Sequence, residues 1–125
     1  MIRITVEAQH NLTTFICSGT LKGSEILDTM QSFYEGSPTL HVLWDLSDTI
    51  MRETASKDVG QAISIIQQRK SNRQGGKTAI VAPRNHEYGM ARMFQTRAKI
   101  RKLPFETKIF KTLEEARQWL LSVEI

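Results

Sequence analysis

Two polar segments of the chain, 45–56 and 84–88, carry side chains that could bind a ligand. Each segment follows an apolar run and precedes a helical pattern, and the free N–H groups at the start of a helix favour an anion. Positive charge at Arg84 and His86 would strengthen that preference. The candidate ligand-binding residues are Asp45, Ser47, Arg84, His86 and Tyr88. They predict contacts with a protein partner or with a small anionic or apolar ligand.

Ser56 carries a hydroxyl at the predicted start of a helix, and two roles fit that position. Serine is a favoured N-cap residue, and Asp58 in the first turn complements the helix dipole. A phosphate on Ser56 would also be stabilised at the start of a helix. The sequence therefore predicts either a structural cap or a phosphorylation site.

The residue types that enzymes use do not form a catalytic pattern in this chain. GGKT at 75–78 matches the end of a phosphate-binding loop, but Ser71 stands where the first glycine belongs, and the segment leads into a strand rather than out of one. Cys17 lies in an apolar segment and is predicted to be a small buried side chain. The three histidines lack the spacing of zinc ligands. We therefore expect a non-enzymatic protein that uses no metal and no cofactor.

Composition and charge narrow the classes of partner. With 40% hydrophobic and 24% charged residues, the chain has the composition of a globular protein, and no apolar run is long enough to span a bilayer. We therefore expect a cytoplasmic protein. Ten Lys and Arg residues and one acid, Glu87, lie in segment 59–105. Aromatic residues do not interleave with these cations as in a stacking platform, so we do not expect a nucleic-acid partner.

Hydrophobic periodicity predicts nine elements in the order ββαβαβαβα. Strands are predicted at 2–7, 13–17, 40–46, 78–82 and 105–110, and helices at 23–36, from Ser56 to the polar run 67–76, at 85–102 with Asn85 as its cap, and from Thr112 onward. The last helix opens with the capping box Thr112-x-x-Glu115 and has a buried stripe of Ala116, Trp119, Leu120 and Val123. Strands that alternate with helices require a mostly parallel sheet. We predict one α/β domain over 1–125, with a five-stranded sheet, an antiparallel edge strand and four helices.

The predicted helix at 85–102 combines apolar bulk with dense positive charge. Its candidate membrane or partner surface consists of Met90, Arg92, Met93, Arg97 and Ile100. Such a helix can lie on an anionic interface, while a neighbouring stripe from Tyr88 to Ala98 faces the core. Met90 and Met93 fit either the core or an exposed surface. That surface would serve a lipid, a protein partner or a homodimer.

The order of elements and three segments resemble the SpoIIAA-like branch of the STAS domains over the whole chain. These segments are VLWDLSD at 42–48, KTAIVAPRNHEYGMARMFQ at 77–95 and KIFKTLEEARQWL at 108–120. The resemblance implies the STAS sandwich fold and a function without catalysis.

The resemblance also implies particular kinds of regulation. Anti-sigma-factor antagonists of the superfamily are phosphorylated on a serine in an Asp-Ser-Ser-Gly motif. An ungapped count here places Ala55 at that serine and Ser56 at the glycine. The SpoIIAA-like branch is similar in outline to CRAL-TRIO lipid-transfer domains, which implies apolar ligands or membrane association. We therefore expect a regulatory binding module. The alternatives are a lipid-binding module peripheral to the inner face of the membrane and a phosphorylation-controlled partner switch.

Overall fold

The computed structural model describes residues 1–51, 54–69 and 72–122. The strands are β1 (Ile2–Glu7), β2 (Leu12–Thr20), β3 (His41–Ile50), β4 (Lys77–Val81) and β5 (Glu106–Phe110). The helices are α1 (Gly23–Glu35), α2 (Ser56–Gln68), α3 (Asn85–Ile100) and α4 (Leu113–Leu120), and a short 3-10 helix, η1 (Ala8–His10), joins β1 to β2. The predicted order of elements is confirmed. Val123, predicted in the buried stripe of the last helix, lies outside the described residues.

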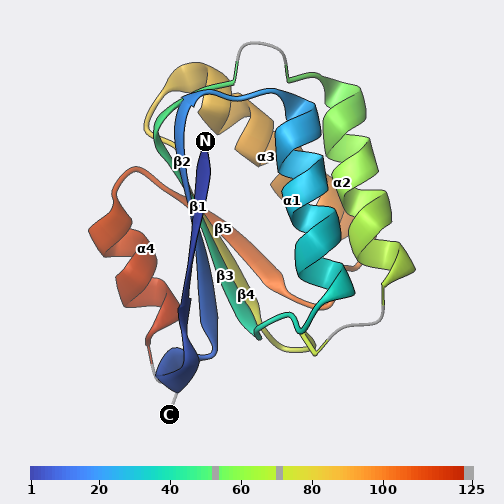
Figure 1. Cartoon of the computed structure of the whole chain (residues 1–125), viewed down its shortest axis with the longest axis vertical. Coiled ribbons are helices and arrows are strands. Elements are labelled where there is room, and N and C mark those ends of the chain that lie inside the picture. Colours follow the sequence, from blue (N-terminus) through green and yellow to red (C-terminus); the bar gives the residue numbers. More distant parts are fainter. Residues whose placement is uncertain (52–53, 70–71, 123–125) are drawn as a thin grey trace.

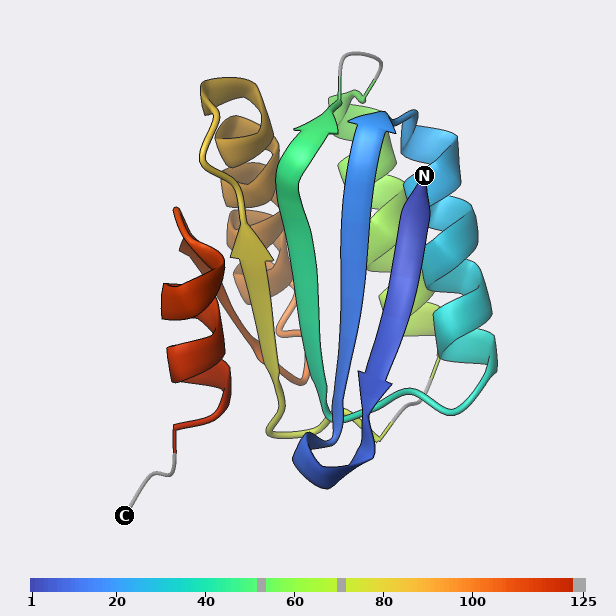
Figure 2. The same cartoon turned by 60° about the vertical axis from the view of Figure 1, so that its left-hand side comes forward.

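The five strands form one sheet in sequence order, β1-β2-β3-β4-β5. β1 pairs antiparallel to β2, and the other neighbours are parallel, as the sequence predicted. Each parallel crossover moves one strand further in the same direction, so the right-handed rule places α1, α2 and α3 on one face of the sheet. Figure 1 and Figure 2 show these three helices on one face and α4 on the other.

β3 is longer than predicted, which corrects the expected loop after Asp45. Ser47, Asp48 and Thr49 were expected in that loop, but the strand continues to Ile50. The reason is that β2 is also long, and its last residues pair with β3 as far as Thr20 opposite Ile50. The side-chain hydroxyl of Thr49, which is buried, donates a hydrogen bond of 2.6 Å to the carbonyl oxygen of Gly19. Strand pairing thus overrides the polar composition of this segment.

Two helix starts differ by one residue from the prediction. Ser56 and Asn85 are the first helical residues, and the N-cap positions belong to Ala55 and Arg84. At α2 the carboxylate of Asp58 accepts a hydrogen bond of 2.7 Å from the Ala55 N–H, so the third helical residue does the capping. The predicted cap of α4 is confirmed, because Thr112 Oγ1 accepts a hydrogen bond from the N–H of Glu115.

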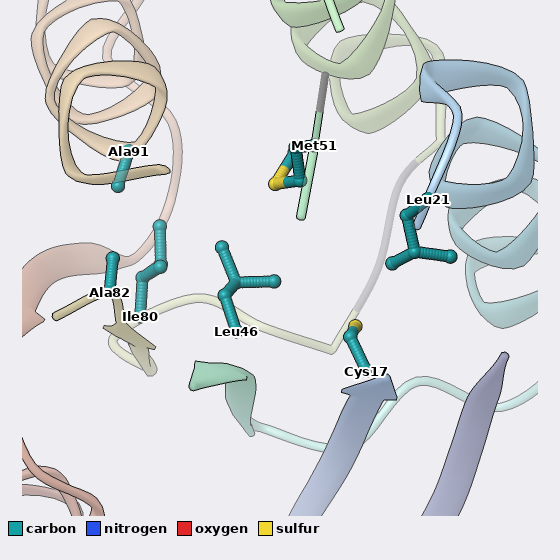
Figure 3. Close-up of a cluster of buried hydrophobic side chains, with 7 residues drawn as sticks. All are labelled: Cys17, Leu21, Leu46, Met51, Ile80, Ala82 and Ala91. Atoms are coloured by element: carbon teal, nitrogen blue, oxygen red, sulfur yellow. The ribbon is translucent and has the colours of Figure 1, made fainter. Parts of the chain in front are cut away.

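Buried side chains fill both faces of the sheet. On the face of α1 to α3, Leu46 and Ile80 point from the strands toward Met51 and Ala91 (Figure 3). On the opposite face, the core side chains pack under α4 and comprise Leu12, Leu43, Ala79, Val81, Ala116 and Leu120. The sheet therefore separates a large three-helix layer from a small one-helix layer.

Candidate functional site

An apolar cavity of about 100 Å³ lies between the sheet and helices α1, α2 and α3. Its lining comes from the three helices, from β3 and β4, and from the segment that follows β3. The lining residues are Gly23, Ile26, Leu27, Met30, Trp44, Leu46, Met51, Thr54, Asp58, Val59, Ala62, Ile80, Met90, Ala91 and Phe94. All but Gly23, Thr54 and Asp58 have apolar side chains. Such a lining suits an apolar guest with a small number of polar contacts.

Two features create this space: side chains of β3 point alternately to the two faces of the sheet, and the helices carry small residues at the cavity. Trp44 and Leu46 face the helices, whereas Leu43 packs under α4, because successive side chains of a strand point to opposite faces. Ala62 of α2 and Ala91 of α3 occupy lining positions where a larger side chain would fill the volume. Small side chains on two facing helices therefore leave the cavity open.

Trp44 forms part of the cavity wall and is held in a fixed orientation. Its ring stacks on Phe15 with 4.2 Å between ring centroids and an interplanar angle of 18°. Phe15 is itself buried and packs edge-on against Phe33 at 5.4 Å. The indole consequently has one face on a rigid aromatic neighbour while it contributes to the cavity lining.

Polar groups occur at the end of the cavity nearest the start of α2. The Asp58 carboxylate lies over Gly23, so closely that a Cβ atom at residue 23 would be 2.5 Å from Asp58 Cγ. Thr54 Oγ1 is buried and has no hydrogen-bond partner within the described residues. One carboxylate and one unsatisfied hydroxyl therefore border an otherwise apolar space. A carboxylate accepts hydrogen bonds and does not donate them, so this end favours a donor and disfavours an anion.

The predicted ligand residues of β3 do not reach this cavity. Asp45 Oδ1 accepts a 2.6 Å hydrogen bond from Ser47 Oγ and a 3.0 Å bond from the Ser47 N–H. Strand alternation places Asp45 on the same face as Leu43, away from Trp44 and the three helices. The structure brings Asp45 and Ser47 together, but on the opposite side of the sheet from the cavity.

Two residues after β4, the predicted His86 and its neighbour Glu87, support one wall of the cavity. His86 Nε2 makes a 2.8 Å hydrogen bond with the carbonyl oxygen of Met51, and the buried carboxylate of Glu87 accepts a 3.4 Å bond from the Met51 N–H. Both groups thereby fix the backbone of a lining residue. Sequence reasoning did not select Glu87, because an acid in the first turn of a helix is ordinarily attributed to the helix dipole.

Arg84 and Tyr88 lie outside the cavity lining. Arg84 is exposed at the N-cap of α3. Tyr88 is half-buried against the apolar cluster of Figure 3, and the ammonium group of Lys111 lies 4.3 Å from the centre of its ring. Of the five predicted ligand residues, His86 has the most direct connection to the cavity, through Met51.

The predicted partner surface on α3 divides between the cavity and solvent. Met90 lines the cavity and Met93 is half-buried, whereas Arg92 is exposed. Arg97 donates hydrogen bonds to the carbonyl and hydroxyl oxygens of Ser56. Ile100 is 70% exposed. The apolar surface that α3 presents to solvent is therefore concentrated at its C-terminal end.

Solved structures with the same architecture include three informative chains. An uncharacterized DUF3478-family protein with a SpoIIAA-like fold from Shewanella loihica PV-4 is 16% identical, with 96% of this chain and 92% of that chain covered and a TM-score of 0.59. The anti-sigma factor antagonist SpoIIAA in its unphosphorylated form is 13% identical, with 98% and 100% covered and a TM-score of 0.56. The Bacillus cell fate determinant SpoIIAA in its phosphorylated form is 12% identical, with 96% and 99% covered and a TM-score of 0.52.

This chain has a SpoIIAA-like fold. The fold predicted from the resemblance is therefore confirmed, and the described residues include its antiparallel strand pair, β1 with β2, and its four helices. No protein-family model and no curated protein sequence matches the chain.

Within this SpoIIAA-like fold, Ser56 is the exposed first residue of α2. The Arg97 guanidinium reaches it from α3, with 2.8 Å from Nη1 to the Ser56 carbonyl oxygen and 2.5 Å from Nη2 to its hydroxyl oxygen. The Arg97 guanidinium therefore already contacts the hydroxyl group that the sequence predicts as a possible phosphorylation site.

Neither a metal site nor a membrane-spanning helix occurs in the described part of the SpoIIAA-like fold. Within residues 1–51, 54–69 and 72–122, no group of three His, Cys, Asp or Glu side chains converges to hold a metal ion. In the same ranges, no helix has the length and apolar character needed to cross a bilayer.

The thiol of Cys17 is expected to be unreactive in the folded protein. Burial raises the pKa of this thiol to about 12, and Asp45 adds to the increase. Because the thiolate is the nucleophile, labelling by Ellman's reagent at pH 8 should be on the order of 10³-fold slower than in urea-unfolded chains. Absorbance at 412 nm measures both rates. Equal rates in native buffer and in urea would contradict the buried position of Cys17.

Proposed function

We propose that this protein is a non-enzymatic binding module that takes a small apolar molecule, with a hydrogen-bond donor at one end, into the cavity between α1, α2 and α3. The observation that carries the proposal is the composition of that cavity, whose lining is apolar except for Gly23, Thr54 and Asp58. Apolar walls supply affinity through the hydrophobic effect. The carboxylate of Asp58 and the unsatisfied hydroxyl of Thr54 would orient a hydroxyl or ammonium group.

The volume of the cavity limits the size of the ligand. A dry cavity of about 150 Å³ lined by Leu, Ile and Phe accepts benzene in another protein, so about 100 Å³ suits a short hydrocarbon segment. Met30 and Met90 line the space, and their unbranched side chains can adjust to a longer guest. The space is partly open to solvent, so the remainder of a guest longer than the cavity can extend out of it.

The charge at the polar end separates this proposal from one based on an anionic ligand. A carboxylate ligand would bring a second negative charge close to Asp58, and like charges at such short distances repel one another in a site of low dielectric constant. The cationic groups predicted as ligand residues, Arg84 and His86, are absent from the cavity lining. The cavity therefore favours a neutral alcohol or an amine over a fatty acid.

A titration with straight-chain alcohols tests the proposal. Trp44 is the reporter, and the variant Trp119→Phe removes the other tryptophan, which lies on the far side of the sheet against Phe110. Each added methylene should increase affinity by about fourfold, since its burial contributes about 0.8 kcal/mol. The increase should stop at the length that fills the cavity. Octan-1-ol and octylamine should bind more tightly than octanoate at pH 7.

Two outcomes would overturn this proposal. An unchanged Trp44 spectrum, together with native mass spectrometry that detects no bound octan-1-ol, would exclude an apolar ligand in the cavity. Tighter binding of octanoate than of octan-1-ol would exclude the role assigned to Asp58. The variant Asp58→Asn supplies the matched test, because it keeps the shape of the side chain and should abolish the preference for octylamine over octanoate.

A phosphorylation-controlled partner switch is a second candidate, favoured by the contact between Arg97 and Ser56. A phosphate on Ser56 would gain charge-assisted hydrogen bonds from that guanidinium and from the start of α2. One of the similar solved structures is the phosphorylated form of SpoIIAA. Incubation with kinases from the source cell should then add phosphate to the wild-type chain and not to Ser56→Ala. Equal incorporation in both, or none in either, would reject this candidate.

Association with an anionic membrane remains the third candidate. It is supported by Ile100, which is 70% exposed and lies between Lys99 and Arg101 at the end of α3. Co-sedimentation should then be stronger with phosphatidylserine vesicles than with phosphatidylcholine vesicles, and Ile100→Ser should weaken it. Equal sedimentation with both vesicle types would reject an electrostatic membrane contact.

A further inference from the structure

The outer edge of β1 is an unpaired strand edge within the described residues. In the described part of the chain, β1 pairs with β2 alone, and the sheet order places it at one end of the sheet. Figure 2 shows β1 along the border of the sheet, with α1 beside and behind it. A free edge presents a row of N–H and C=O groups that can pair with another chain.

The register identifies which backbone groups of β1 point outward. Met1 and Ser18 exchange both of their hydrogen bonds, each 2.9 Å long. Hydrogen-bonded and non-hydrogen-bonded pairs alternate along an antiparallel ladder. Arg3, Thr5 and Glu7 therefore direct their N–H and C=O groups toward β2. The N–H and C=O groups of Ile2, Ile4 and Val6 point away from the sheet.

The same strand exposes apolar side chains. Ile4 and Val6 are 55% and 59% exposed, although the register with β2 places both on the same face as Ile2 and Cys17, the face that carries α1. Ile2, on that face too, is partly buried against the cluster that contains Cys17 and Leu21. The edge thus combines outward backbone groups and exposed aliphatic side chains at Ile4 and Val6.

The opposite edge of the sheet is protected by side chains. At β5, Gln95 of α3 donates a 2.9 Å hydrogen bond to the carbonyl oxygen of Thr107. Lys108 follows on the same strand, and Lys is a residue that blunts strand edges. β1 contains no lysine, and its charged residues, Arg3 and Glu7, are not those whose backbone groups point outward.

The charged residues of β1, Arg3 and Glu7, indicate that a second copy of this chain can pair with the free edge. In an antiparallel pairing of two β1 strands centred on Thr5, Ile4 lies opposite Val6 of the second copy, and Arg3 lies opposite Glu7 of the second copy. Ile4 and Val6 then form the hydrogen-bonded pairs that their outward backbone groups require. Opposite charges directly across an antiparallel pair contribute roughly 0.2–1 kcal/mol each, and the symmetry produces two such pairs.

We propose that the protein forms a homodimer through antiparallel β1–β1 pairing centred on Thr5, which joins two five-stranded sheets into one. Within one copy, the Glu7 carboxylate already accepts hydrogen bonds from Nη1 and Nη2 of Arg117, at 2.9 Å and 3.0 Å. In the dimer, its carboxylate lies between Arg117 and Arg3 of the second copy. This interface differs from the α3 surface that the sequence suggested for self-association. It is also independent of the cavity and of the proposed function.

Cysteine cross-linking tests both the dimer and its register. Thr5→Cys places two thiols opposite one another, with Cα atoms about 4.5 Å apart, within the range that a disulfide spans. Arg3→Cys is the matched control, because two copies of residue 3 would be about 13 Å apart along the strands. Mild oxidation should cross-link Thr5→Cys at least tenfold faster than Arg3→Cys. Cys17 does not compete, since it is buried.

Sedimentation of charge variants gives an independent test. The wild-type chain should sediment as a dimer at about 100 µM, an order-of-magnitude concentration for a small interface. Ile4→Lys should sediment as a monomer. The double variant Ile4→Lys with Val6→Glu should recover the dimer, because the introduced lysine of one copy then faces the introduced glutamate of the other. A wild-type monomer at this concentration, or equal cross-linking of Thr5→Cys and Arg3→Cys, would overturn the proposal. Circular dichroism of each variant establishes that the fold is retained.

Discussion

The variant Arg73→Ala is expected to lose about 3–5 kcal/mol of the free energy of unfolding, because it leaves several buried acceptors without donors at about 1–3 kcal/mol each. Arg73 is 1% exposed and is among the largest fully buried side chains of the described residues. Total stabilities of small domains are about 5–15 kcal/mol, so this loss would remove a large part of the stability. The chain is expected to be partly unfolded at 37 °C.

The guanidinium of Arg73 satisfies four acceptors from separate parts of the chain. It donates to the carbonyl oxygens of Leu40 and Lys77, both at 3.1 Å, to the hydroxyl of Tyr34 at 2.9 Å, and to the hydroxyl of Thr78 at 2.7 Å. These bonds connect α1, the segment before β3, and β4. Alanine would leave buried oxygen atoms without donors, and each such atom costs about 1–3 kcal/mol.

The aromatic neighbours of Arg73 add to the expected loss. Its guanidinium carbon lies 4.0 Å from the centre of the Phe105 ring, which places the cation over the ring face. Burial raises the pKa of the Tyr34 hydroxyl, while the charge and hydrogen bond of Arg73 lower it. The neutral phenol therefore remains a good partner for the guanidinium near neutral pH. A lysine side chain has three donors and no planar fork, so Arg73→Lys should recover only part of the loss.

Urea denaturation followed by circular dichroism measures this effect. Arg69→Ala is the matched control, because Arg69 lies close in sequence but forms a surface ion pair with Glu35 at 2.9 Å, with side chains 38% and 50% exposed. Exposed pairs contribute about 0–1 kcal/mol. If the urea midpoint of Arg73→Ala fell no further than that of Arg69→Ala, the buried network would not be the stabilising feature inferred here.

The role of Arg73 could not be predicted from the sequence because it depends on contacts between segments that are brought together only in the folded protein. The residue belongs to the polar run 67–76, in which the sequence indicates only the end of a helix. Its acceptors come from positions 34, 40, 77 and 78, so they are assembled only when α1 and β4 are packed together. Gly76 shows the same dependence, since a Cβ atom there would clash with the carbonyl oxygen of Leu40. Local composition contains neither constraint.

Hydrophobic periodicity predicted the helices and strands well. Each element buries one face, and that face is visible in the spacing of its own apolar residues. The order of these elements was therefore enough to predict a mostly parallel sheet. The start of α4 could be predicted because Thr112 accepts a hydrogen bond from the backbone of Glu115, only three residues away. The end of β3 failed because its last residues pair with a strand thirty positions earlier, as in Thr49 opposite Gly19. Strand ends depend on the partner strand as much as on composition.

The cavity proposed as the site overlaps little with the residues that the sequence predicted as ligand-binding residues. The sequence predicted a site at the carboxyl end of the sheet, and His86 from that prediction contacts the wall of the proposed cavity through Met51. The cavity itself depends on distances among three helices and on two alanines, Ala62 and Ala91, whose small size has no local signature. Asp45 and Ser47 had suitable chemistry, but the alternation of a longer strand directs them to the other face.

Filling the cavity is expected to abolish ligand binding while the fold is retained. Ala62 of α2 is 7% exposed and lines the cavity, so the ring of Ala62→Phe should occupy the space available to a guest. Affinity for octan-1-ol should fall at least tenfold, which corresponds to about 1.4 kcal/mol. Adding atoms to a packed core typically costs about 1–3 kcal/mol, but here the new ring enters existing space, so the stability should change by less than that.

The comparison that decides this prediction uses a neighbour on the same helix. Ile63 is buried at 4% exposure but does not line the cavity, and Ile63→Val should cost about 0.5–1.5 kcal/mol without changing affinity. Stability and binding should therefore separate, with Ala62→Phe stable and unable to bind, and Ile63→Val less stable and able to bind. Isothermal titration with octan-1-ol and urea denaturation provide the two measurements. Undiminished binding by Ala62→Phe would show that the guest occupies another place, because the ring and the alcohol cannot share the same volume.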